Sequence, residues 1–144
     1  MSVIKQSREM PYTAEQMFAI VNDIELYGEF LPYFEKSVVH HRDIDEVQAT
    51  LVVSAAGMKK SFTTHNRMQH NKMIEIRLVD GPFSHLEGFW RFDETPTGCL
   101  ISFDLEFQFS TRLMGMLLEP VFEQVTQQML GAFCDRAEAL HAVR

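Results

Sequence analysis

The amino-acid sequence predicts an α+β fold in which a curved antiparallel sheet wraps around a long C-terminal helix. Between residues 35 and 109, apolar and polar residues alternate through five consecutive segments, which is the period of β-strands. From residue 111 to residue 141 the apolar residues recur with the helical period instead. Because 46% of the 144 residues are apolar, the chain can bury a core, and we expect residues 1–144 to form one domain.

The N-terminal part predicts a strand followed by a helix. Residues 3–9 alternate weakly, and Pro11 ends the strand because proline has no amide hydrogen to donate. Thr13 is expected to cap a helix over residues 14–22, and a glutamine three residues later completes a capping box. Residues 24–34 then form a short second helix or a turn, whose apolar side chains are placed to cover the gap between sheet and C-terminal helix.

The following segments predict a meander of five strands. Glycine, asparagine and proline punctuate the alternation at short intervals, as they do in hairpin turns. On the second of these strands Thr64 and Asn66 share the inward phase with Phe62, so their polar groups need partners inside an apolar space. A meander of this length must twist and curl. The expected strands lie within residues 35–55, 58–69, 74–78, 83–93 and 99–109.

The C-terminal helix is expected to carry the opposite wall of the interior. Its apolar stripe covers about a third of the helix circumference and needs a partner surface. Pro120 lies inside this helix and removes one backbone hydrogen bond, so we expect either a kink or a break into a short leading turn and a long helix. The stripe contains Met114, Leu118, Val121, Phe122, Val125, Met129, Phe133 and Leu140.

A cavity between sheet and helix is the candidate binding site. Twelve Phe and nine Met give an adaptable apolar wall, although an ordinary core rich in these residues has the same composition. Trp90 is either a ligand-stacking wall or a core anchor. The residues expected to line the cavity are Tyr27, Phe30, Leu31, Phe62, Asn66, Leu78, Phe83, Trp90, Phe103, Met114, Leu118, Val121, Phe122, Val125 and Met129.

Other functional classes find little support in the sequence. The net charge of −7 and the scattered lysines and arginines argue against binding to naked DNA or RNA. No metal-ligand spacing or nucleophile–base pair is present, and His65 and His85 fall on the polar phase of their strands. Cys99 and Cys134 are expected to be reduced thiols. Without an apolar leader or spanning segment, the protein is expected in the cytosol, with at most a peripheral contact to the inner membrane.

Several stretches resemble one known family. The sequences VNDIELYGEFLP (residues 21–32), LVDGPFSHLEGFWRF (78–92) and EPVFEQVTQQMLGAF (119–133) resemble the bacterial ribosome-association toxin A family, as do PYTAEQMF (11–18) and KSFTTHN (60–66). That family belongs to the coenzyme-Q-binding, START-like group of polyketide cyclase/dehydrase and lipid transport proteins. The resemblance covers nearly the whole chain and implies the helix-grip fold.

The resemblance implies two different functions. One is non-enzymatic binding of ubiquinone or another polyprenyl lipid in support of respiration, with no covalent cofactor. For this function our own hypothesis is that Asn66, Tyr27 and Trp90 are the candidate donors to the quinone oxygens. The other is binding to the large ribosomal subunit as a toxin that blocks subunit joining. The acidic chain, with Glu119 where relatives often carry glycine, favours the first. A third alternative is a polyketide cyclase or aromatase.

Overall fold

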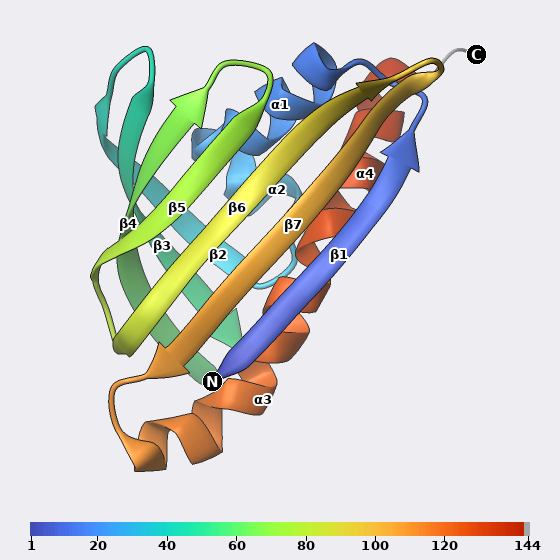
Figure 1. Ribbon diagram of the computed structural model, residues 1–144. Coiled ribbons are helices and arrows are strands. Elements are labelled where there is room, and N and C mark those ends of the chain that lie inside the picture. The colour runs from blue at the N-terminus through green and yellow to red at the C-terminus, as the bar shows by residue number, and fades with distance from the viewer. Residues whose placement is uncertain (143–144) are drawn as a thin grey trace.

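Seven antiparallel strands form one curved sheet, and the helices lie against one of its faces (Figure 1). The computed structural model describes residues 1–142. Along the sheet the strand order is β1-β7-β6-β5-β4-β3-β2, so that the first strand lies beside the last. The strands are β1 (Ser2–Met10), β2 (Phe34–Arg42), β3 (Glu46–Ala55), β4 (Met58–Gln69), β5 (Met73–Asp80), β6 (Phe83–Thr95) and β7 (Gly98–Phe109).

The meander contains six strands, and the prediction of five was wrong. Residues 35–55 form a hairpin, in which the Asp43 amide donates a hydrogen bond of 2.8 Å to the carbonyl of Glu46. Strand β2 is the outer edge of the sheet, and most of its residues are exposed. Because a strand exposed on both faces does not need an apolar face, it shows weak alternation in the sequence.

The N-terminal helices follow the predicted order. Helix α1 (Ala14–Asn22) begins with the expected capping box, in which the Thr13 hydroxyl accepts a bond from the Gln16 amide at 3.0 Å. Residues 24–34 contain two short helical turns, a 3-10 turn η1 (Ile24–Leu26) and α2 (Tyr27–Phe30). Both turns lie against the inner face of the sheet near helix α4, and their buried side chains join the core.

The C-terminal helix is interrupted, but not at its proline. Pro120 lies within α3 (Arg112–Gln127), and the chain continues as α4 (Met129–His141) after a break at Gln128. The buried Thr126 hydroxyl donates to the carbonyls of Phe122 at 2.9 Å and Glu123 at 3.1 Å, a contact that bends helices. On β1, the Gln6 amide donates to the Gln127 carbonyl at 3.1 Å. The break is therefore held by side-chain hydrogen bonds.

The core lies between the concave face of the sheet and the helices. Strands β3, β4, β6 and β7 alternate buried and exposed residues as the sequence predicts. Both cysteines, Cys99 and Cys134, are buried and unpaired, which confirms the expected free thiols. Within residues 1–142, no helix combines the length and the apolarity that a membrane crossing requires.

Candidate functional site, a cavity of two chambers

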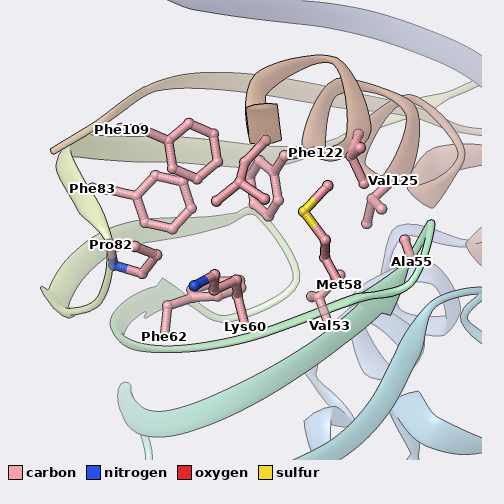
Figure 2. Close-up of a pocket in the computed structure, with 12 residues that line it drawn as sticks. Val53, Ala55, Met58, Lys60, Phe62, Pro82, Phe83, Phe109, Phe122 and Val125 are labelled. Atoms are coloured by element: carbon pink, nitrogen blue, oxygen red, sulfur yellow. The ribbon is translucent and has the colours of Figure 1, made fainter. Parts of the chain in front are cut away.

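An apolar chamber opens between α3 and the ends of the strands, and we call it the outer chamber (Figure 2). Figure 2 shows Met58 reaching from β4 toward the α3 side chains, with Phe83 and Phe109 to one side. Its cavity volume is about 30 Å³, which holds about two water molecules. The lining consists of Val53, Ala55, Met58, Lys60, Phe62, Pro82, Phe83, Phe109, Leu118, Val121, Phe122 and Val125.

A second chamber lies deeper between the sheet and the helices, and we call it the inner chamber. Its cavity volume is about 50 Å³, room for about four water molecules. The short turns of residues 24–34 close one side of it through Ile24 and Tyr27. The full lining is Ile24, Tyr27, Phe34, Ala49, Leu51, Phe62, Thr64, Asn66, Ile76, Leu86, Trp90, Phe103, Leu105, Phe122, Thr126 and Met129.

Two aromatic rings separate the chambers. Phe62 and Phe122 line both, and their ring centroids lie 5.8 Å apart with the rings nearly perpendicular. On the outer side Phe83 contacts both rings, at 5.6 Å from Phe62 and 5.1 Å from Phe122. The Phe62–Phe122 and Phe62–Phe83 pairs are edge-to-face, a geometry that is favourable beyond the area that it buries. These two rings, which we call the Phe62–Phe122 partition, therefore lie between the two chambers.

The inner chamber contains several buried polar groups. Asn66 and Thr64 are buried on the inward face of β4, as predicted. The Asn66 side-chain oxygen Oδ1 is buried and has no hydrogen-bond partner. The Tyr27 hydroxyl donates to the Val21 carbonyl, and burial raises the pKa of Tyr27 far above its usual range, so this phenol stays neutral.

Trp90 is a core anchor, one of the two roles that its sequence position suggested. Its indole stacks on Phe103, the residue opposite on β7, with centroids 4.1 Å apart, and meets the Phe133 ring edge-to-face at 5.1 Å. It is 1% exposed and also lines the inner chamber. The indole is thus a core anchor that forms part of the chamber wall.

Most of the residues expected to line the cavity meet in these two chambers. From the sheet and the short turns they are Tyr27, Phe62, Asn66, Phe83, Trp90 and Phe103; from the helices they are Leu118, Val121, Phe122, Val125 and Met129. Four others lie outside both linings. Leu31 is in the core, Phe30 packs on Phe133 at 5.7 Å, and Leu78 and Met114 are partly buried against the core.

Some lining residues were not anticipated from the sequence. Ala55, Met58 and Pro82 belong to hairpin ends, where sequence periodicity does not say which way a side chain points. Phe34 and Thr126 border the inner chamber. Phe34 lies beside a register shift in β2, and Thr126 lies beside the end of α3. The inward residues of β3, β6 and β7, by contrast, follow from alternation and could have been included: they are Ala49, Leu51, Val53, Leu86, Leu105 and Phe109.

The electrostatics of the two chambers differ. Among residues 1–142, Lys60 is the only charged residue in the outer lining, and none with an acidic or basic side chain belongs to the inner lining. His65 and His85 line neither chamber and instead lie 3.7 Å from Glu46 and 3.3 Å from Glu106. Side-chain atoms of His85, Glu87 and Glu106 that could coordinate a metal ion lie within 4.8 Å of one another. These residues are on the outer face of the sheet, away from the cavity.

Comparisons with known proteins agree with this architecture. A family model described as polyketide cyclase/dehydrase and lipid transport matches residues 10–134. The chain belongs to this family. The ribosome association toxin RatA of Escherichia coli strain K12 is 37% identical to this chain over 145 residues. The alignment covers 100% of this chain and 92% of that protein.

A more distant relative has a different name. The mitochondrial coenzyme Q-binding protein COQ10 of Drosophila melanogaster is 26% identical over 127 residues, or 85% of this chain and 52% of that protein. Among solved structures, a START superfamily protein from Mycobacterium smegmatis superposes with a TM-score of 0.80 at 21% identity, covering 96% of this chain and 99% of that one. The family's START-like helix-grip fold is therefore confirmed for this chain.

Proposed function

We propose that the chain binds ubiquinone or another polyprenyl lipid in the two chambers, without transforming it. The observation that carries the proposal is the inner chamber, which is apolar and uncharged but contains the buried Asn66 carboxamide, whose NH2 group can donate to a carbonyl. Small-molecule sites characteristically combine apolar walls with a few convergent polar groups. The COQ10 relative, named for coenzyme Q binding, supports this chemical class.

The lining favours a neutral guest over a charged one. Burying apolar surface yields about 25 cal/mol per Å², so a long isoprenoid tail gains binding energy with little directional recognition. A carboxylate head, as in a fatty acid, would lose its hydration in the inner chamber and find no basic side chain in the lining. A quinone carries no charge and avoids this cost.

Binding requires the chambers to enlarge. Volumes of about 30 Å³ and 50 Å³ admit a few water molecules but not a substituted quinone ring. The guest must therefore displace the Phe62–Phe122 partition or shift α3 away from the hairpin ends. Such a change occurs when the guest binds the open state more tightly than the closed one.

The lining also argues against enzymatic catalysis. A cyclase would need a group that exchanges protons near neutral pH. Tyr27 is the only titratable residue in the inner lining, and its raised pKa and its bond to Val21 keep the phenol protonated. The histidines considered above lie outside both chambers. We therefore propose a binding protein, although the family description includes cyclases.

Organic extraction followed by mass spectrometry tests the proposal. Protein purified from its own bacterium should release an isoprenoid quinone or lipid in stoichiometric amount. Val125 is 1% exposed in the outer lining, so Val125→Trp should fill that chamber and release the guest while the protein still folds. Val38→Trp makes the same change on edge strand β2, at a side chain 38% exposed, and should keep the guest. Full retention in Val125→Trp would refute the site.

We further propose that the protein lies in the cytoplasm and makes a peripheral contact with the inner membrane. Leu113, Met116 and Leu117 are 66%, 71% and 58% exposed on the first two turns of α3, the helix that forms one wall of the outer chamber. Exposed apolar side chains beside a cavity would let a lipid enter without crossing water. Leu117→Glu should reduce flotation with lipid vesicles, whereas Ile44→Glu, at a side chain 91% exposed on the β2–β3 turn, should not.

Binding to the large ribosomal subunit, with a block of subunit joining, is the second candidate function. The Escherichia coli relative named ribosome association toxin covers the whole chain at 37% identity, and this likeness favours the alternative. The net charge of −7 opposes docking on RNA phosphates, so a ribosomal protein would be the contact. Sedimentation with isolated ribosomal subunits distinguishes this function from lipid binding. If protein without bound lipid migrated with the large subunit, ribosome binding would be the main function and lipid binding in the cavity a minor one.

A further inference from the structure

Two polar side chains of the inner chamber share one face of β4. Thr64 is 3% exposed and Asn66 is 8% exposed, and both belong to the lining of this chamber. Side chains two positions apart on a strand point to the same side of the sheet, about 7 Å from each other. The hydroxyl and the carboxamide therefore face the same enclosed space.

The sheet around these two residues offers them no partner. In the part of the chain that the structure describes, neither the Thr64 hydroxyl nor the Asn66 carboxamide takes part in a hydrogen bond. The residues opposite them on β3 and β5 have apolar side chains: Val47, Ala49, Ile76 and Leu78. Because buried polar groups are nearly always paired, these two side chains call for a ligand or an ordered water molecule.

The other two hydroxyls of the inner lining have already used their hydrogens. The Tyr27 hydroxyl donates to the Val21 carbonyl. The Thr126 hydroxyl donates to carbonyls of its own helix. A carboxamide donates through its NH2 group, and a threonine hydroxyl has one hydrogen to donate. Among the hydroxyls and amides of the described lining, Thr64 and Asn66 thus hold the free donors.

We propose that Thr64 and Asn66 form a head-group subsite, in which the two side chains donate hydrogen bonds to the two carbonyl oxygens of a 1,4-quinone. This inference rests on the proposed function and narrows the polyprenyl guest to one whose head carries two acceptors. Those oxygens lie at opposite ends of the ring, so a ring that lies along β4 presents one oxygen to each donor. A polyprenyl alcohol has a single hydroxyl and leaves one donor unpaired.

The subsite also orients the guest. Both donors are in the inner lining, whereas the outer lining is apolar apart from Lys60. An apolar tail therefore suits the outer chamber, and the ring suits the inner one. Once the rings of the Phe62–Phe122 partition have moved aside, the tail passes between the chambers and leaves along α3, with the head group innermost.

Quenching of intrinsic fluorescence tests the subsite. Trp90 is the only tryptophan and lines the inner chamber, so a quinone ring beside it should quench most of the emission at saturation. Protein extracted free of lipid is titrated with decyl benzoquinone, a benzoquinone that carries a decyl tail. Decylbenzene has the same tail and a ring without oxygens, and its Kd is measured by displacement of the quinone.

Two variants remove one donor each. A hydrogen bond corresponds to a change of up to about tenfold in Kd, so Thr64→Val and Asn66→Leu should each weaken the binding of decyl benzoquinone by about that factor. Neither variant should change the Kd of decylbenzene, which has no oxygen to accept a hydrogen bond. The urea midpoints of both variants should not fall, since apolar groups of similar size replace unpaired polar ones.

Tyr27→Phe is the matched control. It removes from the same lining a hydroxyl whose hydrogen is already donated to Val21, so the Kd of decyl benzoquinone should stay the same. An unchanged Kd in either Thr64→Val or Asn66→Leu would overturn the two-donor subsite and leave the proposed function standing. Equal weakening by Tyr27→Phe would also overturn it, because general polarity of the chamber would then explain the effect. Binding of neither probe by the wild type would overturn the proposed function itself.

Discussion

Phe122→Ala tests whether the Phe62–Phe122 partition controls access to the inner chamber. Phe122 is 8% exposed, and its ring lies 4.8 Å from Phe107, 5.1 Å from Phe83 and 6.0 Å from Phe109 in addition to its contact with Phe62. Truncating a buried phenylalanine to alanine typically costs about 3–5 kcal/mol. Because two cavities already border this ring, fewer contacts are lost, and we expect a cost near the lower end, about 3 kcal/mol.

Urea unfolding and stopped-flow fluorescence measure the two effects of this change. A loss of about 3 kcal/mol lowers the urea midpoint by about 1–3 M. The decyl benzoquinone should quench Trp90 faster in the variant than in the wild type, since the guest no longer has to displace the ring. At a hundredfold excess over its Kd the guest should restore about 2.7 kcal/mol.

Phe18→Ala provides the matched control. Phe18 is 2% exposed on α1, packs on Phe92 at 5.5 Å, and lies outside both chambers. Its truncation should lower stability by a similar amount and leave the quenching rate unchanged. If Phe18→Ala accelerated quenching as much as Phe122→Ala, faster entry would reflect general loosening of the fold, and the argument for a partition would fail.

Three further changes have defined outcomes. Gly81→Ala places a Cβ 2.7 Å from the Cβ of Phe62 at a φ of +152°, whereas at Gly57 φ is +76° but no atom lies within 4 Å of an added Cβ. Urea unfolding should therefore show a larger loss of stability for Gly81→Ala than for Gly57→Ala. Equal losses of stability would contradict the steric argument. Thr13→Ala removes the capping box and should cost about 1 kcal/mol in the same assay, and an unchanged midpoint would show that the cap contributes nothing. Burial, and to a lesser extent the negative charge of Glu25, raises the pKa of Asp23 in the folded protein above the value of 3.8 in the unfolded chain. Ionisation of Asp23 therefore reduces the stability of the fold as pH rises. Asp23→Asn should therefore stabilise the protein at pH 7, by less than about 1 kcal/mol for this half-buried group, and the effect should disappear below pH 3.8. A pH-independent effect would exclude the carboxylate as its cause.

The regular strands could be predicted from the sequence because one of their faces is buried. Strict alternation placed Thr64 and Asn66 inside, and the structure agrees. Alternation fails at irregular positions. Strict alternation would put Phe83 and Leu86 on opposite faces, because their positions differ by three. A register shift between Phe83 and His85 lets both side chains face inward. No residue type in that segment marks the shift.

The interruption of the C-terminal helix could not be located from local rules. Those rules point to Pro120, which the helix accommodates, whereas the break lies at Gln128. Hydrogen bonds from the Thr126 hydroxyl and from Gln6, a residue far away in the sequence, lie beside it. For the same reason the division into two chambers was not predicted, because the contact between Phe62 and Phe122 joins a strand to a distant helix.

Pro120 has a consequence for how α3 unfolds locally. A proline lacks the amide hydrogen that would bond the carbonyl of Met116, one turn earlier. The first two turns of α3 are thus joined to the rest of the helix by one hydrogen bond fewer. Amides in this stretch should exchange with deuterium sooner than those near Val125. The turns that expose Leu113, Met116 and Leu117 are then also the part of α3 that we expect to open before the part around Val125.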